Sequence, residues 1–362
     1  MKQLDYKGIT IIKSDSFEEI KNRIKEPLPE RFRPEVLKLL KETNPFLQEY
    51  YYAYNEEHYA FFVTYQSKMN ILTLGKNTWN MKVTTIGYPC SLSCPGYITD
   101  DLNFLLYVSG VIKGARLILN VPDLAKDKDG KVRTQGDLKM GFGETLPTCM
   151  FSCRFDSIDE YMNALRSPYR RRLRLAMKYC MEAGIEKTEE TSNEANSKDT
   201  KAMDLSSKAA KEDIYPLYLN TYEKSGYKLE RMEADFFRRI EADKIIYRKD
   251  GKPVGFTLLR KEGTHLDFML CGMDYSIKTA DLYYYMLFNI IEYAIRNHCK
   301  TIDFGQTSEQ TKLKFGAYLE KRYYYAAHTN PLLNLFARFG NALLEYKYDF
   351  LDYKVMKQNN NR

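Results

Sequence analysis

The stretch that decides the fold is KIIYRKDGKPVGFTLLRKEGTHLDFMLC, residues 244–271. It contains three runs of the β-branched, aromatic and aliphatic residues typical of strands, at 244–248, 254–260 and 264–271. The runs are separated by Asp250-Gly251 and Glu262-Gly263, pairs that favour tight turns. The stretch therefore predicts two consecutive hairpins and a sheet of three antiparallel strands.

The segments around these strands alternate between strand and helix patterns. A strand and two helices are predicted before them, at 185–188, 213–224 and 233–242. A long helix, a strand, a short helix and a last strand are predicted after them, at 281–297, 301–304, 308–315 and 322–327. The apolar residues of the long helix recur at steps of four, so they lie on one face. The predicted order is β-α-α-β-β-β-α-β-α-β, a mixed α/β fold.

The first half also mixes strands with helices, so the chain is expected to form two α/β domains. Ser167-Pro168 starts a helix that ends at Gly184, and the polar segment 189–204 predicts a flexible connection. At roughly 150 residues per domain, the chain is long enough for two. The predicted domain bounds are 1–165 and 166–330, followed by a C-terminal helix and tail at 331–362.

The composition is that of a globular protein, with 44% hydrophobic and 28% charged residues. Lys and Arg number 55 against 48 Asp and Glu, a formal net charge of +7. This mild excess suits an anionic ligand or a phosphate-bearing partner, and DNA is not among the expected partners. The N-terminal stretch lacks the apolar run of a signal peptide, and no run approaches about 18 apolar residues. A cytoplasmic protein without a transmembrane helix is therefore expected.

The seven cysteines favour reduced, structural thiols. Cys90 and Cys94 share a spacing with Cys149 and Cys153, which makes a metal site an alternative. However, the residues between the second pair have strand character, and no histidine is near either pair in sequence. No metal site is therefore expected.

Two segments resemble a known family. Residues 302–308, IDFGQTS, with Lys312 and Gly316, resemble the "DFG-x-T-S … K-x-x-x-G" signature of the FemAB-like acyltransferases. Residues 165–174, LRSPYRRRLR, are similar to the "S-x-x-R-R-x-L-R" segment before the last domain of that group. The resemblance covers about residues 155–330. It implies two GNAT-like domains, of which the N-terminal one is degenerate.

The resemblance also implies an acyltransferase that joins an acyl group to an amine by direct attack, without a metal or a covalent enzyme intermediate. The expected donor is a coenzyme A thioester. An alternative donor is aminoacyl-tRNA, which the best-known branch uses to build peptidoglycan cross-bridges on a cell-wall precursor. The sequence has no long helical insertion of the kind that grips tRNA, which favours a small donor. A further alternative is a non-catalytic binding protein on a GNAT fold.

Three residues are candidates for the base that takes a proton from the attacking amine, whose pKa is about 10 if it resembles lysine. They are His265, Asp267 and Asp303. Strict alternation along strand 264–271 would place its odd-numbered residues, through Cys271, on one face. That face is too polar for a packed core and indicates the wall of a cleft. A structural hydrogen bond is the alternative role of each candidate, and Asp303 would then anchor the end of its strand.

The turn before the long helix is where GNAT folds hold the donor's pyrophosphate, through backbone N–H groups and the helix dipole. Here that turn lacks Gly-x-Gly, and the expected donor-binding residues are Lys278, Thr279 and Ala280. The missing glycines leave open a different donor or a silent fold. Lys312 stands where the family keeps a lysine and is expected to contact the donor's carbonyl or phosphate. An exposed lysine without that role is the alternative.

A stripe of cations marks the helix that starts at Ser167. Arg166, Arg170 and Arg174 recur every four residues, Arg171 widens the stripe, and no acidic residue interrupts it. Closely spaced like charges repel, so a pyrophosphate, a tRNA backbone or a nucleotide-linked precursor would relieve the repulsion. The four arginines are the expected substrate-binding residues, with a solvated basic face as the alternative.

Residues 331–353 have an amphipathic helical pattern, with Leu332, Phe336, Phe339 and Leu343 spaced by three or four. The apolar side of such a helix is expected to pack onto the body of the protein. Contact with a membrane surface is the alternative.

Overall fold

The computed structural model describes residues 1–44, 46–70, 80–90, 92–192, 214–226, 231–277, 281–340, 346, 348 and 352–357. The chain divides into two compact units, and each is made of two separate segments. Unit 1 comprises Met1–Pro147 and Lys321–Tyr348, and unit 2 comprises Thr148–Glu320 and Asp349–Arg362. The strands β8 (Gly141–Ser152) and β14 (Tyr318–His328) carry the chain between them.

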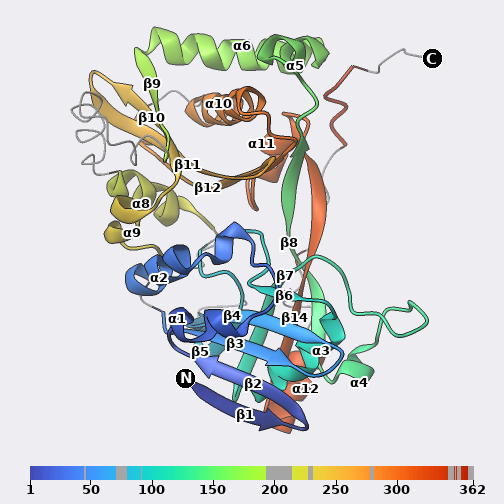
Figure 1. The fold of residues 1–362 in the computed structure, drawn as a ribbon. Coiled ribbons are helices and arrows are strands. Elements are labelled where there is room, and N and C mark those ends of the chain that lie inside the picture. Colours follow the sequence, from blue (N-terminus) through green and yellow to red (C-terminus); the bar gives the residue numbers. More distant parts are fainter. Residues whose placement is uncertain are drawn as a thin grey trace. The chain divides into compact units, whose positions relative to one another are not determined.

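Unit 1 is built on a mixed β-sheet (Figure 1). Its strands lie in the order β1-β2-β3-β4-β5-β7-β14, with β6 paired to β4, and β5 and β7 run parallel. The strands are β1 (Lys2–Tyr6), β2 (Ile9–Ser14), β3 (Gln48–Tyr54), β4 (Tyr59–Asn70), β5 (Asn80–Ile86), β6 (Tyr97–Thr99) and β7 (Ala115–Val121). The α-helices are α1 (Phe17–Ile20), α2 (Pro34–Thr43), α3 (Leu102–Val108), α4 (Gln135–Leu138) and α12 (Pro331–Phe339), and short 3-10 turns lie at Lys21–Arg23, Glu30–Phe32 and Ser109–Val111.

Helices cover both faces of the unit 1 sheet, and β3 shows how. Tyr50 packs against Phe17 of α1, with ring centroids 5.4 Å apart, and its hydroxyl donates to the carbonyl of Leu37 in α2. The next residue, Tyr51, packs in the opposite core cluster with Phe104 of α3. A strand buried on both sides loses the alternation of polar and apolar residues, so β3 lacks the sequence pattern of a half-exposed strand.

Within unit 2 the sheet is also mixed, and its strands lie in the order β8-β13-β12-β11-β10-β9. Its helices α5, α6 and α10 lie on one side of the sheet, and α8 and α9 on the other (Figure 1). The strands are β9 (Ile185–Glu190), β10 (Asp243–Lys249), β11 (Lys252–Glu262), β12 (His265–Met273) and β13 (Thr301–Asp303). The helices are α5 (Ile158–Ala164), α6 (Ser167–Glu182), α8 (Tyr215–Lys224), α9 (Ala234–Arg239), α10 (Leu282–Arg296) and α11 (Glu309–Leu313).

The predicted order of elements is confirmed from β9 to β14, and both units have the predicted mixed α/β class. Both predicted hairpins form, since β10 pairs with β11 and β11 with β12, each antiparallel. The predicted domain boundary at 165/166 lies inside unit 2, because the second half of β8 pairs with β13 there, with Phe151 opposite Ile302.

The strict alternation predicted for strand 264–271 is wrong, because β12 contains a β-bulge. Leu258 of β11 faces Leu270 and Leu259 faces Phe268, so Met269 is an extra residue. A bulge of one residue exchanges the two faces of the strand beyond it. Cys271 therefore lies on the core side, below α10, and not on the side of His265 and Asp267.

The C-terminal helix is shorter than predicted in the described chain, and its orientation is not the expected one. α12 spans Pro331–Phe339, and none of its residues is buried. The expected packing of its apolar side onto the protein is therefore wrong for Leu332, Phe336 and Phe339, while Leu343 of the same predicted face lies outside the described residues. None of the helices in the described ranges is long and apolar enough to cross a membrane.

Close packing of α8 on β12 depends on Gly272. A Cβ atom at this position would lie 2.5 Å from the backbone carbon of Leu217 and 2.5 Å from the backbone nitrogen of Tyr218, both in α8. We expect Gly272→Ala to lower the free energy of unfolding by about 1–3 kcal/mol, because backbone atoms cannot move aside as a side chain can. Urea unfolding measures this loss. Gly226→Ala is the control, since a Cβ there meets nothing within 4 Å; an equal loss in both variants would contradict the packing argument.

Candidate functional site

A row of polar side chains crosses the unit 2 sheet on the face opposite α10. The strand register places Asp267 of β12 beside Asp303 of β13, and His265 beside Thr301. On the other side of β12, Arg260 of β11 is the partner of Asp267. Residues paired across neighbouring strands point to the same face, so these five side chains share one surface of the sheet.

Asp267 is the centre of this row. Its Oδ2 accepts from Arg260 Nη2 at 2.6 Å and from Nε at 3.1 Å. Its Oδ1 lies 3.2 Å from Nε2 of His265, whose Nδ1 lies 2.7 Å from Oγ1 of Thr301. The arrangement is a chain of polar contacts from Thr301 through His265 and Asp267 to Arg260.

The ionisation of this chain follows from its contacts. Burial alone would raise the pKa of Asp267, but the hydrogen bond with His265 and the charge of Arg260 outweigh burial and lower it. The same hydrogen bond raises the pKa of His265 above its ordinary value, although partial burial acts against it. Asp267 is therefore held as a carboxylate and is a poor base, whereas His265 gains basicity and has a side chain that is 36% exposed.

Asp303 closes the end of β13. Its Oδ1 accepts from the hydroxyl of Thr148 at 2.5 Å and from the backbone N–H of Gly305 at 2.7 Å. A carboxylate that accepts from a backbone N–H two residues on fixes a turn. The predicted alternative for Asp303, that it anchors its strand end, is the role seen in these contacts.

Lys312 of α11 lies beneath that turn and is only 2% exposed. Its Nζ donates to the carbonyl of Gly305 at 3.1 Å and to that of Gln306 at 2.8 Å. Burial lowers its pKa, while nearby Cys149 and Asp303 act in the opposite direction. The alternative of an exposed lysine is wrong.

The turn between β13 and α11 is conformationally unusual. Gly305, Thr307 and Ser308 all have a left-handed φ, of 72°, 65° and 53°. Such a conformation is costly for Thr and persists only when the surroundings enforce it. Here the two carbonyls bound by Lys312 and the N–H bound by Asp303 enforce it. Strain of this kind concentrates at functional sites, which makes this turn a candidate for contact with a ligand.

Beside this turn, one edge of β12 has no partner strand in the described chain. The pairing of β12 with β13 covers three residue pairs and ends at Asp267 and Asp303, whereas β12 continues to Met273. The bulge at Met269 lies at the start of this free edge.

Burial raises the pKa of Cys271 to about 11, with the charge of Lys312 acting against it, so the thiol stays protonated at neutral pH.

The start of α10 is the expected donor-binding turn. Lys278, Thr279 and Ala280 lie outside the described residues. Asp281, the N-cap of α10, is 6% exposed and forms an ion pair with Arg172 of α6. The guanidinium of Arg172 also stacks on the ring of Tyr284, 4.3 Å from its centroid. A buried carboxylate at this helix end works against an anionic ligand there.

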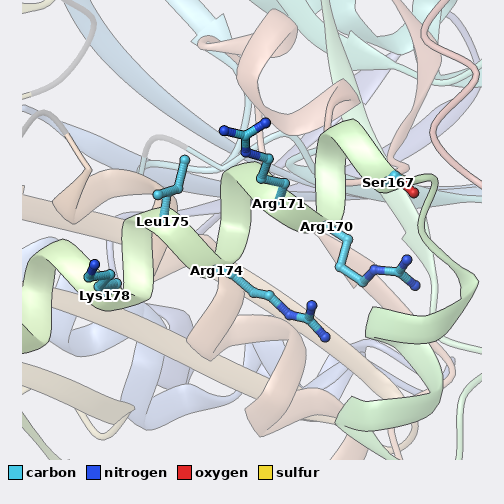
Figure 2. A pocket seen from close by; sticks show the side chains of 6 residues that line it. All are labelled: Ser167, Arg170, Arg171, Arg174, Leu175 and Lys178. Carbon is cyan, nitrogen blue, oxygen red and sulfur yellow. The ribbon is translucent and has the colours of Figure 1, made fainter.

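The predicted arginine stripe lies along α6, where it lines a hollow of about 350 Å³ (Figure 2). The side chains around it belong to Ser167, Arg170, Arg171, Arg174, Leu175 and Lys178. Arg170 and Arg174 extend to the same side of the helix, and Arg171 to the other. Among the described residues, no carboxylate pairs with any of these three arginines. Arg166 is the N-cap of α6, its backbone N–H donates to the carbonyl of Val355, and it is not among the residues that line the hollow.

The structure thus brings His265, Asp267 and Asp303 together on one face, and of these three only His265 is not buried. Sequence reasoning missed Arg260 and Thr301. The signal for Arg260 was available, because a two-residue turn after Glu262 sets the register that places Arg260 opposite Asp267. In the described parts of the chain, no group of three or more His, Cys, Asp or Glu side chains is placed to hold a metal ion.

The Arg260–Asp267 pair gives a stability prediction, because both side chains are about nine-tenths buried. Asp267→Ala removes the carboxylate that pairs with the buried charge of Arg260, so we expect a loss of about 3–5 kcal/mol in the free energy of unfolding. Arg260→Met combined with Asp267→Leu removes both charges and should recover most of that loss. Urea unfolding at neutral pH measures both variants. A double variant as unstable as the single one would show that the pair is not the source of the loss.

Comparison with known proteins matches residues 167–313 to the family model of the acetyltransferase (GNAT) domain. No curated protein matches the chain. Among solved structures, FemX aligns at 14% identity over 93% of this chain and 100% of its own, with a TM-score of 0.47. The tandem GNAT protein of the clavulanic acid biosynthesis pathway aligns at 7% identity, over 88% and 98%, with a TM-score of 0.43. The C-terminal domain of a candidate lysylphosphatidylglycerol synthetase from Agrobacterium fabrum aligns at 11% identity, over 81% and 88%, with a TM-score of 0.45. In sequence, residues 167–313 are thus similar to GNAT acetyltransferase domains.

Proposed function

We propose that unit 2 is an N-acyltransferase that moves an acyl group from a coenzyme A thioester to an amine. The observation that carries this proposal is the free, bulged edge of β12, in a segment similar to GNAT domains. An unpaired strand edge offers backbone N–H and C=O groups to an extended, amide-containing donor arm. One of its N–H groups can also donate to the carbonyl oxygen that becomes negative during acyl transfer.

The proposed reaction is a direct attack. The amine lone pair forms a bond to the donor's carbonyl carbon, the tetrahedral oxyanion collapses, and the carbon–sulfur bond breaks. The leaving thiolate takes up a proton, and the amine nitrogen loses one. An amine with a pKa of about 10 is mostly protonated at neutral pH, so a base is needed.

We assign the base to His265. Its side chain reaches solvent, and its pKa is raised by Asp267, which brings it closer to that of the amine. Asp267, held ionised by Arg260, orients the ring and stabilises the protonated imidazole. Asp303 and Lys312 are positioning residues in this proposal, because their contacts fix the Gly305–Gln306 turn beside the free edge.

A second candidate is aminoacyl transfer from aminoacyl-tRNA, and the cations of α6 favour it. Arg170 to Lys178 spans about 12 Å of helix, at about 1.5 Å per residue, which exceeds the reach of a single pyrophosphate. A nucleic-acid backbone would engage several of these cations at once. Asp281 at the N-terminus of α10 also disfavours a pyrophosphate there. The acceptor would then be an amine such as that of a cell-wall precursor.

The donor is tested by thermal unfolding of the whole chain with acetyl-coenzyme A and, separately, with aminoacyl-tRNA. A ligand at about 100 times its Kd adds roughly 2.7 kcal/mol to stability, which is a clear shift in Tm. The thioester proposal expects this shift with acetyl-coenzyme A, followed by acyl transfer in an amine screen. A shift with aminoacyl-tRNA alone moves the assignment to the second candidate, and no shift with either contradicts both.

Reversing the charge of two arginines on α6 distinguishes further between the two candidate donors. If tRNA is the donor, Arg170→Glu with Arg174→Glu should weaken its binding by at least about tenfold and flatten the dependence of log Kd on log salt. The control is Arg238→Glu with Lys252→Glu, two exposed cations of unit 2 outside α6, because it changes the net charge equally. Equal weakening in both pairs would indicate general attraction rather than a site on α6.

The role of His265 predicts a pH profile. A histidine accepts a proton only when neutral, so kcat/KM falls as the pH drops through its pKa. Because that pKa is raised, the acid limb should lie above about 6.5. Asp267→Asn removes the contact that raises it, so the limb should move to lower pH, while His265→Gln should abolish it.

The control for this profile is His58→Ala. His58 in unit 1 also has a pKa raised by a hydrogen bond with an aspartate, Asp100, but it lies outside the proposed site. The His58→Ala variant should therefore leave the pH dependence of kcat/KM unchanged. An acid limb that stays in place in Asp267→Asn would show that His265 is not the base.

A further inference from the structure

The helix α12 turns its apolar residues to solvent. Phe336 is 75% exposed, Phe339 is 72% exposed and Leu332 is 70% exposed. The three recur at steps of four and three, so they form one face of the helix, and Leu335 widens it. Large aromatic and aliphatic side chains gathered and exposed in this way mark a binding surface.

The polar side of α12 faces the protein instead. Asn334 accepts from the backbone N–H of His328 at 2.9 Å, and its amide donates to the carbonyl of Lys139 at 3.0 Å. Asn330 accepts from the N–H groups of Leu332 and Leu333, so the first turn of the helix has satisfied donors. A helix on a water-exposed surface normally has the opposite arrangement. These hydrogen bonds hold α12 on unit 1 with its apolar face outward.

Two exposed cations lie in segments that are hydrogen-bonded to α12 or to the residues just before it. Arg338, the charged residue within Pro331–Phe339, has a buried Nε and is not one of them. Exposed Lys139 belongs to the loop that Asn334 holds, and exposed Lys113 precedes Gly114, which exchanges two hydrogen bonds with Thr329 just before the helix. The nearby carboxylate of Asp137 is engaged by the N–H and hydroxyl of Thr134.

We propose that α12 docks unit 1 onto the surface of an anionic lipid bilayer. Phe336, Phe339 and Leu332 enter the boundary between headgroups and acyl chains, while Lys113 and Lys139 meet the anionic headgroups. An apolar helix face with exposed cations in the adjoining segments is an arrangement that binds such surfaces. A protein groove would complement the apolar face alone and leaves exposed Lys113 and Lys139 without a role. This inference concerns unit 1 and does not rest on the proposed acyl transfer.

The test is flotation of the full chain with vesicles of phosphatidylcholine and with vesicles of phosphatidylcholine and phosphatidylglycerol. The chain should float with the anionic vesicles. Phe336→Ser with Phe339→Ser should lower the partition coefficient by about tenfold or more, since each ring loses its burial in lipid. The matched control is Leu47→Ser with Met181→Ser, which removes two exposed apolar side chains elsewhere, 53% and 72% exposed. Lys113→Glu with Lys139→Glu should weaken binding to the anionic vesicles only.

Three results would overturn the proposal. The first is no flotation with either vesicle. The second is equal loss in the serine pair on α12 and in the control pair, with native circular dichroism in both. The third is a dimer of the unmodified chain in sedimentation equilibrium that becomes a monomer in Phe336→Ser with Phe339→Ser, since the face would then be covered by a second copy.

Discussion

The extra residue in β12, Met269, is the constraint on which the candidate site depends. Before it, His265 and Asp267 share a face with the polar residues of the neighbouring strands. After it, Cys271 turns to the core side below α10. The parallel pairing with β13 also ends just before the bulge, so one strand serves first as a closed part of the sheet and then as a free edge. Because both parts belong to the nine residues of β12, the polar side chains of His265 and Asp267 lie next to the strand edge that has no partner strand in the described chain.

The buried charges of Arg260, Asp267 and Lys312 in unit 2 are tolerated because each has hydrogen-bond partners. Arg260 and Asp267 neutralise one another, and His265 and Thr301 satisfy the remaining oxygen and the imidazole. Lys312 donates to two backbone carbonyls, and the nearby charges of Cys149 and Asp303 offset in part the effect of its burial. Because removing one member of such a set leaves another uncompensated, loss of activity in a variant needs a measurement of folding beside it.

Much of unit 2 could be predicted from the sequence, since its hairpins carry Asp-Gly and Glu-Gly turns and its long helix has a regular apolar repeat. The bulge could not be predicted, because methionine is not a residue type that indicates a bulge. The side of the sheet predicted for the residues after Met269 was therefore the opposite of the observed one. The left-handed Thr307 and Ser308 are likewise fixed by Lys312 and Asp303, which are contacts through space. In α12 the pattern was correctly amphipathic, but a pattern does not say which side meets the protein, and Asn334 decides that.

The central claim, that the free edge of β12 receives the acyl donor, is tested most directly by amide hydrogen exchange. The chain is compared alone, with acetyl-coenzyme A and with aminoacyl-tRNA. The account predicts that amides within 268–272 gain protection with one of the two donors, because the donor pairs with backbone groups that have no partner strand in the described chain. The N–H of Met273 is left out because it already donates to the hydroxyl of Thr221. Donor binding with unchanged exchange throughout β12, or no protection with either donor, would contradict it.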